Sequence, residues 1–284
     1  MGNYGKADER YAYALENWRH KFGFEHIKSA EILTKKAKLY LKWNEDREEV
    51  VNMLDTAARI VQKAVTDRHP QYAEAIELKG KVLIELEEFD EALKLLNTAA
   101  HIYEDTYGSK HLKAADNNAI IGDLYYRKGE YKVAVSRYDK SVKSYKNLFD
   151  EYHPKYVGTV TKIAQSYYAQ GNYKEASKKL DEATEIYLSF IRRFFPALSE
   201  KEKAKFWMSI RPVFELYNSL ALEYGKDKNK VIRNMYSNQI ATKALLLNSS
   251  VKIKKTILNS GKPALIEEFN ELLEKRALLT STLG

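Results

Sequence analysis

Apolar side chains recur at helical spacing through the middle of the chain. Over residues 112–128, apolar or small residues fall close to an i, i+3, i+4, i+7 stripe, and Gly129-Glu130 interrupts it. A second stripe begins at Tyr131. Such stripes predict two amphipathic helices joined by a short turn. The same arrangement recurs over residues 155–170 and 173–194, so the pattern predicts successive helix pairs.

The helix pairs repeat at a nearly constant interval. A Gly-x-Tyr-x-x-Ala motif begins at Gly2, Gly129 and Gly171, and a degenerate copy covers residues 87–92. Histidines keep the same interval, with steps of 43, 42 and 42 residues along the series His26, His69, His111 and His153. Self-similarity at this period indicates a solenoid of stacked helix pairs. A solenoid offers an extended surface, which favours a binding function.

The period ends after Phe194. We therefore expect two domains. Residues 1–194 would hold the repeats, as a partial first unit followed by four units of 42–43 residues, and residues 195–284 would form a helical extension or cap. Because the chain opens within the turn motif of a repeat, we expect it to be a fragment that further repeats precede.

Signals for helix ends divide the extension. Ser199 and the glutamate three residues later form a capping box, which predicts a helix that ends near Tyr224. Pro212 lies inside this helix and predicts a kink. Two further helices are expected, one over about residues 228–258 and one from the following Gly-Lys-Pro break to about Leu279.

Composition narrows the function classes. Hydrophobic residues make up 44% of the 284-residue chain, but no run of about 18 apolar residues and no signal-peptide core occurs, so we expect no membrane association. The sequence has no cysteine, which excludes disulfides and cysteine nucleophiles within it. These features favour a cytoplasmic protein. The net charge of +8 is uneven, because residues 195–284 hold 15 basic residues against 9 acids.

Three sets of positions carry a family resemblance. A small residue occupies the point where the two helices of a pair would cross, at Gly80, Gly122 and Ala164. An aromatic residue opens the second helix, at Tyr4, Phe89, Tyr131 and Tyr173. A small residue lies seven positions beyond the motif alanine or its equivalent, at Ala14, Ala57, Ala99, Ser141 and Ala183. These positions resemble the tetratricopeptide repeat in its 42-residue form, which occurs in kinesin-light-chain-like proteins.

The resemblance covers residues 1–194 and is weakest over residues 26–66, where Trp43-Asn44-Glu45-Asp46 replaces the turn motif. It implies an all-α fold, in which a right-handed superhelical solenoid of tetratricopeptide helix pairs is followed by a helical extension. It also implies a non-catalytic protein–protein interaction module, because members of the family bind proteins or peptides.

The second half resembles a different family segment. Residues 198–214, 238–247 and 257–261 are similar to the helices between the tetratricopeptide repeats and the caspase-like CHAT protease domain of bacterial repeat–CHAT proteins. The resemblance implies that this chain is the partner-sensing or regulatory part of a larger protease, whose catalytic domain would lie downstream. The alternative is a plain scaffold or adaptor that binds peptides without any switch.

A concave groove lined by first helices is the main candidate site that the resemblance implies. By register, the exposed first-helix positions are Lys38, Glu74, Glu77, Lys81, Asp116, Asp123, Tyr126, Thr161, Gln165 and Tyr168. Charged and aromatic groups on such a wall suit an extended peptide or a partner helix. Its acidic members favour a ligand with some basic character. The alternative is a solvated face without a ligand.

The basic residues of the second half form another candidate docking face, made of Lys226, Lys228, Lys230, Arg233, Lys243, Lys252, Lys254 and Lys255. It would suit an acidic surface such as a neighbouring domain. Nucleic-acid binding is the less favoured alternative, because Tyr236 is the only interleaved aromatic residue and no nucleic-acid motif surrounds it.

Catalytic, cofactor and metal sites find no support in the sequence. No carboxylates fall in an acid–base motif, and the Gly-x-Tyr turns join helix to helix rather than strand to helix as in a phosphate loop. The histidines of the repeats lie one per unit, whereas a zinc site needs three or four ligands around one ion. We therefore expect these histidines to serve in turns or helix caps.

Overall fold

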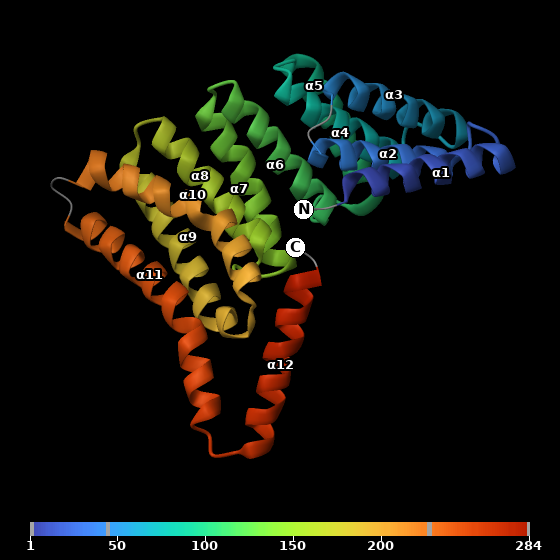
Figure 1. Cartoon of the computed structure of the whole chain (residues 1–284). Coiled ribbons are helices and arrows are strands. Elements are labelled where there is room, and N and C mark those ends of the chain that lie inside the picture. The colour runs from blue at the N-terminus through green and yellow to red at the C-terminus, as the bar shows by residue number, and fades with distance from the viewer. Residues whose placement is uncertain (1–2, 44–45, 226–228, 283–284) are drawn as a thin grey trace. The chain divides into compact units, whose positions relative to one another are not determined.

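A computed structural model of the chain describes residues 3–43, 46–225 and 229–282, and the side chains of residues 200, 244–256, 273 and 276–282 also lie outside the description. The described residues form twelve α-helices and one 3-10 turn, without any strand (Figure 1). The chain divides into two compact units, Met1–Ala176 and Ser177–Gly284.

The first unit is a stack of helix pairs. Its helices are α1 (Tyr4–Phe22), α2 (Ile27–Trp43), α3 (Arg47–Ala64), α4 (Pro70–Glu85), α5 (Phe89–Tyr107), α6 (Leu112–Arg127), α7 (Tyr131–Leu148) and α8 (Pro154–Ala169). Each helix packs against the next along the chain. In addition, α2 contacts α4 and α4 contacts α6, so the first helices of successive repeats are neighbours. The all-α solenoid of helix pairs that the sequence predicts is confirmed.

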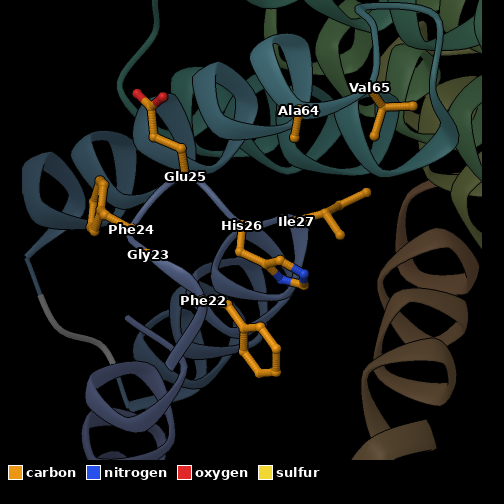
Figure 2. A pocket seen from close by; sticks show the side chains of 8 residues that line it. All are labelled: Phe22, Gly23, Phe24, Glu25, His26, Ile27, Ala64 and Val65. Atoms are coloured by element: carbon orange, nitrogen blue, oxygen red, sulfur yellow. The ribbon is translucent and has the colours of Figure 1, made fainter. Parts of the chain in front are cut away.

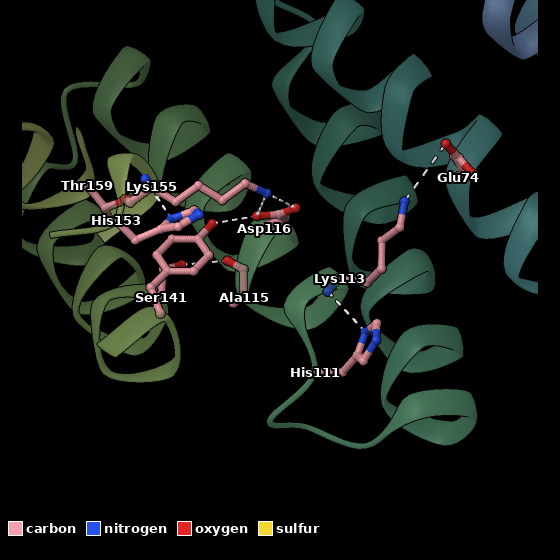
Figure 3. Close-up of polar contacts among 10 residues, drawn as sticks. Glu74, His111, Lys113, Ala115, Asp116, Ser141, His153, Lys155 and Thr159 are labelled. Carbon is pink, nitrogen blue, oxygen red and sulfur yellow. Dashed lines mark hydrogen bonds and ion pairs between the residues drawn. The ribbon is translucent and has the colours of Figure 1, made fainter. Parts of the chain in front are cut away.

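Histidine caps begin the first helix of each repeat. The Nδ1 atoms of His69, His111 and His153 each accept a hydrogen bond from the backbone N–H two residues later, at 3.2 Å. Figure 3 shows this contact for His111 and His153. His26 makes the same bond to the N–H of Lys28, also at 3.2 Å. The side chain thereby satisfies a backbone donor that the helix leaves unpaired. The predicted cap role of these four histidines is confirmed.

The turn motif depends on a left-handed backbone conformation. Gly129 and Gly171 adopt φ values of 77° and 70°, which glycine tolerates without a steric penalty. Glu87 holds the equivalent place in the degenerate copy, with a φ of 65°. The degenerate repeat thus keeps the turn geometry despite a less suitable residue.

Close helix crossing explains the small residues of the repeat. A Cβ atom at Gly122 would lie 2.5 Å from a ring carbon of Tyr138, and one at Gly80 would lie 2.9 Å from Cγ of Leu96. Ser141 is fully buried, and its hydroxyl donates a hydrogen bond to the carbonyl of Ala115 at 2.6 Å (Figure 3). The helices of a pair can approach one another only where these positions stay small.

The second unit continues from within α9 (Tyr173–Phe194), which begins in the first unit. It contains the 3-10 turn Phe195–Ala197, α10 (Glu200–Tyr224), α11 (Asn229–Leu258) and α12 (Pro263–Thr282). Ser199 forms the predicted capping box with Glu202. A core of apolar side chains includes Phe195, Ile210 and Phe214. The three predicted helices of the extension are confirmed, each within about three residues at its ends.

Candidate partner-binding face

Ion pairs connect the first helices of successive repeats. Lys155 of α8 places Nζ at 2.6 Å from both carboxylate oxygens of Asp116 in α6 (Figure 3). Lys162 of α8 pairs in the same way with Asp123 of α6, at 2.7 Å. The side chains of these pairs are 26–41% exposed, so solvent weakens the attraction and the main effect of the pairs is to fix where the ammonium groups lie.

Two tyrosines of α7, the second helix of the same repeat, donate hydrogen bonds to the carboxylates of Asp116 and Asp123. The hydroxyl of Tyr145 donates to Oδ1 of Asp116 at 2.6 Å, and the hydroxyl of Tyr138 donates to Oδ1 of Asp123 at 2.7 Å. Burial, reinforced by the neighbouring carboxylate, raises the pKa of both phenols. Each carboxylate therefore holds a hydroxyl and an ammonium group together, in an arrangement that appears twice along α6.

One repeat earlier, the ion pairs continue but the tyrosine contact is missing. Glu74 of α4 pairs with Lys38 of α2 and lies 3.8 Å from Nζ of Lys113 in α6 (Figure 3). Tyr103 of α5 is fully buried, and its hydroxyl makes no well-aligned hydrogen bond among the described residues. Burial raises the pKa of this phenol, and the Glu77 carboxyl lies close enough to raise it further. Lys113 Nζ lies 5.6 Å from the centre of the Tyr103 ring.

A buried carboxyl group lies next to this unpaired hydroxyl. Glu77 is 8% exposed, and within the described part of the chain its Oε2 atom has no hydrogen-bond partner. Asn117 approaches it but leaves both of its own amide atoms unpaired there. Burial raises the pKa of Glu77, while Lys81 and Lys113 act in the opposite direction. The ionised form of Glu77 is therefore disfavoured.

A small cavity opens beside Glu74. It has a volume of about 180 Å³, and its lining residues are Ala30, Glu31, Thr34, Lys35, Lys38, Val61, Gln71 and Glu74. Oε1 of Gln71 is buried without a hydrogen-bond partner among the described residues. The charged groups that line this cavity come from Glu31, Lys35, Lys38 and Glu74, so it is a polar hollow.

A second, wider cavity lies at the turn edge of the solenoid. It has a volume of about 580 Å³ and is lined by residues 22–27 together with Ala64 and Val65 (Figure 2). Glu25 contributes a carboxylate whose pKa is lowered by its hydrogen bond and ion pair with Lys63. None of the predicted groove residues lines this cavity.

The structure separates the predicted groove residues into three groups. Lys38 and Lys81 are exposed. Six others are partly buried: Glu74, Asp116, Asp123, Tyr126, Gln165 and Tyr168. Glu77 and Thr161 are buried, at 8% and 7% exposure, so the prediction that they are exposed is wrong. Thr161 turns its hydroxyl to the carbonyl of Val157 in its own helix, at 2.9 Å.

The two groove tyrosines are only partly available to a ligand. The ring of Tyr126 lies 5.3 Å from that of Tyr131, and the ring of Tyr168 lies 5.6 Å from that of Tyr173. Both therefore lean toward the start of the second helix of their own repeat. Each still exposes part of its ring, which leaves an apolar edge next to the charged positions.

The charge of the face differs from the sequence-based expectation. Sequence analysis favoured a basic ligand because of the acids at the groove positions. Glu74, Asp116 and Asp123 are already paired with lysines, and the ionised form of Glu77 is disfavoured. We call the five lysines and three paired carboxylates the first-helix face: Lys38, Lys81, Lys113, Lys155, Lys162, Glu74, Asp116 and Asp123. Lysines outnumber carboxylates there, so the basis for a basic ligand is lost.

Sequence reasoning missed three of these lysines. Lys113, Lys155 and Lys162 lie 39 residues after Glu74, Asp116 and Asp123, respectively. A basic residue at a constant offset from an acid, close to the repeat length, was the signal that could have identified them. It places the two charges on adjacent first helices.

The predicted basic docking face is described in part. Lys230, Arg233 and Lys243 are exposed on α11. Lys226 and Lys228 lie outside the described residues, as do the side chains of Lys252, Lys254 and Lys255. Among the residues that the structure describes, no helix is long and apolar enough to cross a membrane, and no cluster of three acidic or histidine side chains could hold a metal ion.

Comparison with known proteins identifies the repeats. A tetratricopeptide-repeat family profile matches residues 71–147 and 114–189. No curated protein matches the chain. Similar solved structures include a putative kinesin light chain with nearly identical TPR-like repeats from Podosopora anserina, with 20% identity, coverage of 67% of this chain and 90% of that chain, and a TM-score of 0.57.

Two further structures extend the likeness over more of the chain. BtubC (BKLC) from P. vanneervenii has 11% identity and a TM-score of 0.61, with coverage of 86% of this chain and 93% of that chain. The apo form of RapI has 17% identity and a TM-score of 0.61, with coverage of 98% of this chain and 93% of that chain. At these identities the likeness concerns the fold.

Proposed function

Because residues 71–189 are tetratricopeptide repeats, we propose that this chain is a non-catalytic module that recognises a protein partner through its first-helix face. Tetratricopeptide repeats are typically protein-interaction modules, and a rigid stack of helices presents a long surface without deep reactive clefts. The observation that carries the proposal is the series of ion pairs between α2, α4, α6 and α8, which fixes lysine ammonium groups on a partly exposed surface.

The charge of this face favours a partner segment with acidic side chains. Lys81 is exposed and makes no hydrogen bond or ion pair with another described residue. It can therefore meet a ligand carboxylate without giving up an internal contact. The cavity beside Glu74 adds a polar hollow in which Lys35 and Lys38 can meet acidic groups of the same segment.

The test uses the chain as bait in lysate of its source organism. Two variants probe the face, Lys81→Gln and the double variant Tyr126→Ala/Tyr168→Ala. Matched controls are Lys132→Gln on α7 and Tyr13→Ala on α1, both at exposed positions away from the first helices. Among the proteins that the parent chain and both controls capture, we expect one whose capture is reduced in both face variants.

The dissociation constant of that protein then decides the outcome. Loss of Lys81 should weaken binding about threefold, as for a partly exposed charge pair. Loss of both tyrosines should weaken it about tenfold or more, because tyrosines commonly dominate protein interfaces. Unchanged affinity in both variants, or capture of the protein by neither the parent chain nor the controls, would contradict the proposal.

The finer assignment concerns a CHAT protease. We propose that partner binding by this chain regulates such a protease, on the basis of the three similar stretches within residues 198–261. The measurement is protease activity of the full-length parent protein with and without the captured partner. Activity that stays unchanged at saturating partner would reject the regulatory role and leave a scaffold as the function.

A further inference from the structure

The outer side of α11 carries a short stripe that no other part of its unit covers in the described residues. Arg233, Tyr236, Ile240 and Lys243 follow one another at spacings of three, four and three, so they share one helix face. Tyr236 is 58% exposed and Ile240 is 68% exposed. Arg233 and Lys243 are exposed as well, one at each end of the apolar pair.

The inner side of the same helix is already occupied. Val231 and Met235 are buried, at 7% and 8% exposure, and Thr242 is 6% exposed. Gln239 donates a hydrogen bond to Asn218 of α10 at 3.3 Å. The inner side thus packs against the rest of the unit, and the larger part of Tyr236 and Ile240 on the outer side stays uncovered.

All charged side chains in the sequence of α11 are basic. From Asn229 to Leu258 the sequence contains six lysine or arginine residues and no acid. Lys230 lies 3.6 Å from Asp181 of α9, a carboxylate that also accepts from Tyr217 and Asn234. No other ion pair to α11 occurs among the described side chains, so Arg233 and Lys243 are not neutralised by this contact.

From this pattern we propose that the outer stripe of α11 binds an acidic amphipathic helix of a protein partner. Such a helix would place two apolar residues against Tyr236 and Ile240 and acidic residues opposite Arg233 and Lys243. Burial of the tyrosine and isoleucine would supply most of the affinity, since aromatic anchors dominate interfaces. The charge pairs at the ends would set orientation and raise the association rate.

Two other classes of partner fit the stripe less well. A nucleic-acid backbone is bound by cations, and an exposed isoleucine at the centre of the stripe would gain nothing from phosphates. A helix that lies in a membrane surface buries a broad apolar face in lipid. In α11 the apolar residues Val231 and Met235 face the interior of the unit. Among the described side chains of this helix, the large exposed apolar ones are Tyr236, Ile240 and, at the far end, Leu258, too few and too scattered for a broad lipid-facing side.

A site-specific cross-link tests the proposal. A photo-reactive amino acid replaces Ser237, an exposed residue beside the stripe, and a control chain carries it at Lys132 on α7. After irradiation in lysate of the source organism, mass spectrometry identifies the attached segment. We expect the Ser237 position to cross-link a protein segment with net negative charge and apolar residues at helical spacing.

Charge exchange then confirms the mode of binding. The identified segment, as a synthetic peptide, should bind the double variant Arg233→Glu/Lys243→Glu at least tenfold more weakly than the parent chain. Replacing its two facing acids by lysine should restore binding to that variant. The substitutions Lys81→Gln and Tyr126→Ala/Tyr168→Ala should leave this binding unchanged, which separates it from the first-helix face.

Several results would overturn the proposal. These are cross-links to nucleic acid or lipid, cross-links to protein segments without an acidic bias, equal labelling from the Lys132 position, and no cross-link at all. Failure of charge exchange to restore affinity would also reject it. Circular dichroism of Arg233→Glu/Lys243→Glu and of the chains substituted at Ser237 and Lys132 should match the parent chain, because these side chains are exposed.

Discussion

Two junctions in the solenoid have the same backbone arrangement and different polar chemistry. One joins α4, α5 and α6, and the other joins α6, α7 and α8, one repeat later. In the later junction the Tyr145 hydroxyl donates to Asp116, which also binds Lys155. In the earlier junction the equivalent Tyr103 hydroxyl has no partner among the described residues. The repeat period places equivalent residues, but it does not ensure that their polar atoms are satisfied.

The polar residues around the tyrosine differ between the repeats, beginning with the acceptor position, where Glu74 stands in place of Asp116. Glu77 stands where the later junction has Ala119, and Asn117 stands where it has Thr159. Thr159 satisfies its hydroxyl within its own helix, at 2.8 Å from the carbonyl of Lys155. Glu77 and Asn117 do not form such a hydrogen bond within their own helices, and their buried polar atoms remain unpaired among the described residues. Unpaired groups of this kind are costly, and in natural proteins they concentrate at functional positions. The earlier junction adjoins the cavity beside Glu74, in agreement with a role for this region in binding.

The largest expected difference between the junctions concerns their crossing glycines. Gly122→Ala would place a methyl group against the Tyr138 ring, which is buried and held by its bond to Asp123. We expect a loss of about 1–3 kcal/mol in the free energy of unfolding. Gly80→Ala meets the flexible Leu96 side chain, so its loss should be smaller. Urea denaturation of both variants measures the two losses.

Gly158 in α8 provides the control for this pair. An added Cβ atom at this position meets no atom within 4 Å. Gly158→Ala should therefore stabilise the chain by up to about 1 kcal/mol, because alanine has the higher helix propensity. A loss at Gly158 equal to that at Gly122 would show that close crossing is not the cause.

A pH-dependent difference should mark the buried carboxyl of the earlier junction. Burial raises the pKa of Glu77 in the folded chain above the unfolded value near 4.5, so the folded state binds its proton more tightly. The contribution of Glu77 to the free energy of unfolding is fully present below the pKa of the unfolded chain. It is lost as the pH rises through the higher pKa of the folded chain. Glu77→Gln removes the titration, and it should stabilise the chain at neutral pH by about 1–2 kcal/mol.

This gain should disappear in acid. Thermal unfolding of Glu77→Gln and the parent chain across the pH range from neutral to below the unfolded carboxyl pKa measures it. Asp116→Asn in the later junction is the control, because that carboxylate is bonded to a hydroxyl and an ammonium group and its loss should be destabilising. A stability gap for Glu77→Gln that is constant with pH would contradict the buried-proton explanation.

The histidine caps should behave alike in the two junctions, with a smaller effect. His111→Ala and His153→Ala each remove the acceptor for one backbone N–H, and we expect each to cost about 1 kcal/mol. His111→Asn should recover most of this loss, since asparagine is a good N-cap residue. His101→Ala at an exposed position inside α5 serves as control and should be nearly neutral. A rescue by asparagine that fails would argue against capping.

The sequence predicted the helices and caps because each has a local signal. The period located the turns at Gly129 and Gly171, and the histidine spacing located the helix starts. In the second unit, Ser199 predicted where α10 begins, and the Gly-Lys-Pro break predicted the boundary between α11 and α12, each to within a few residues. Helix ends and turns depend on the residues next to them in the sequence, so they could be predicted without knowledge of tertiary contacts.

The candidate face was only partly predictable for a physical reason. Helical register shows which residues lie on the same side of a helix, and it correctly predicted that Lys38 and Lys81 are exposed. It does not tell which charge on the next helix lies within reach, so the pairing of Asp116 with Lys155 was missed. It also does not measure how closely neighbouring helices cover a side chain, which decides the burial of Glu77.

The most direct test of the difference between the junctions is urea denaturation of Tyr145→Phe and Tyr103→Phe in parallel. Tyr145→Phe removes a hydrogen bond to a charged group and should lower the free energy of unfolding by about 1–3 kcal/mol. Tyr103→Phe removes a buried hydroxyl that has no partner in the described structure, so it should leave stability unchanged or raise it slightly. Equal losses in both variants, or a larger loss for Tyr103→Phe, would contradict a satisfied later junction and an unsatisfied earlier one.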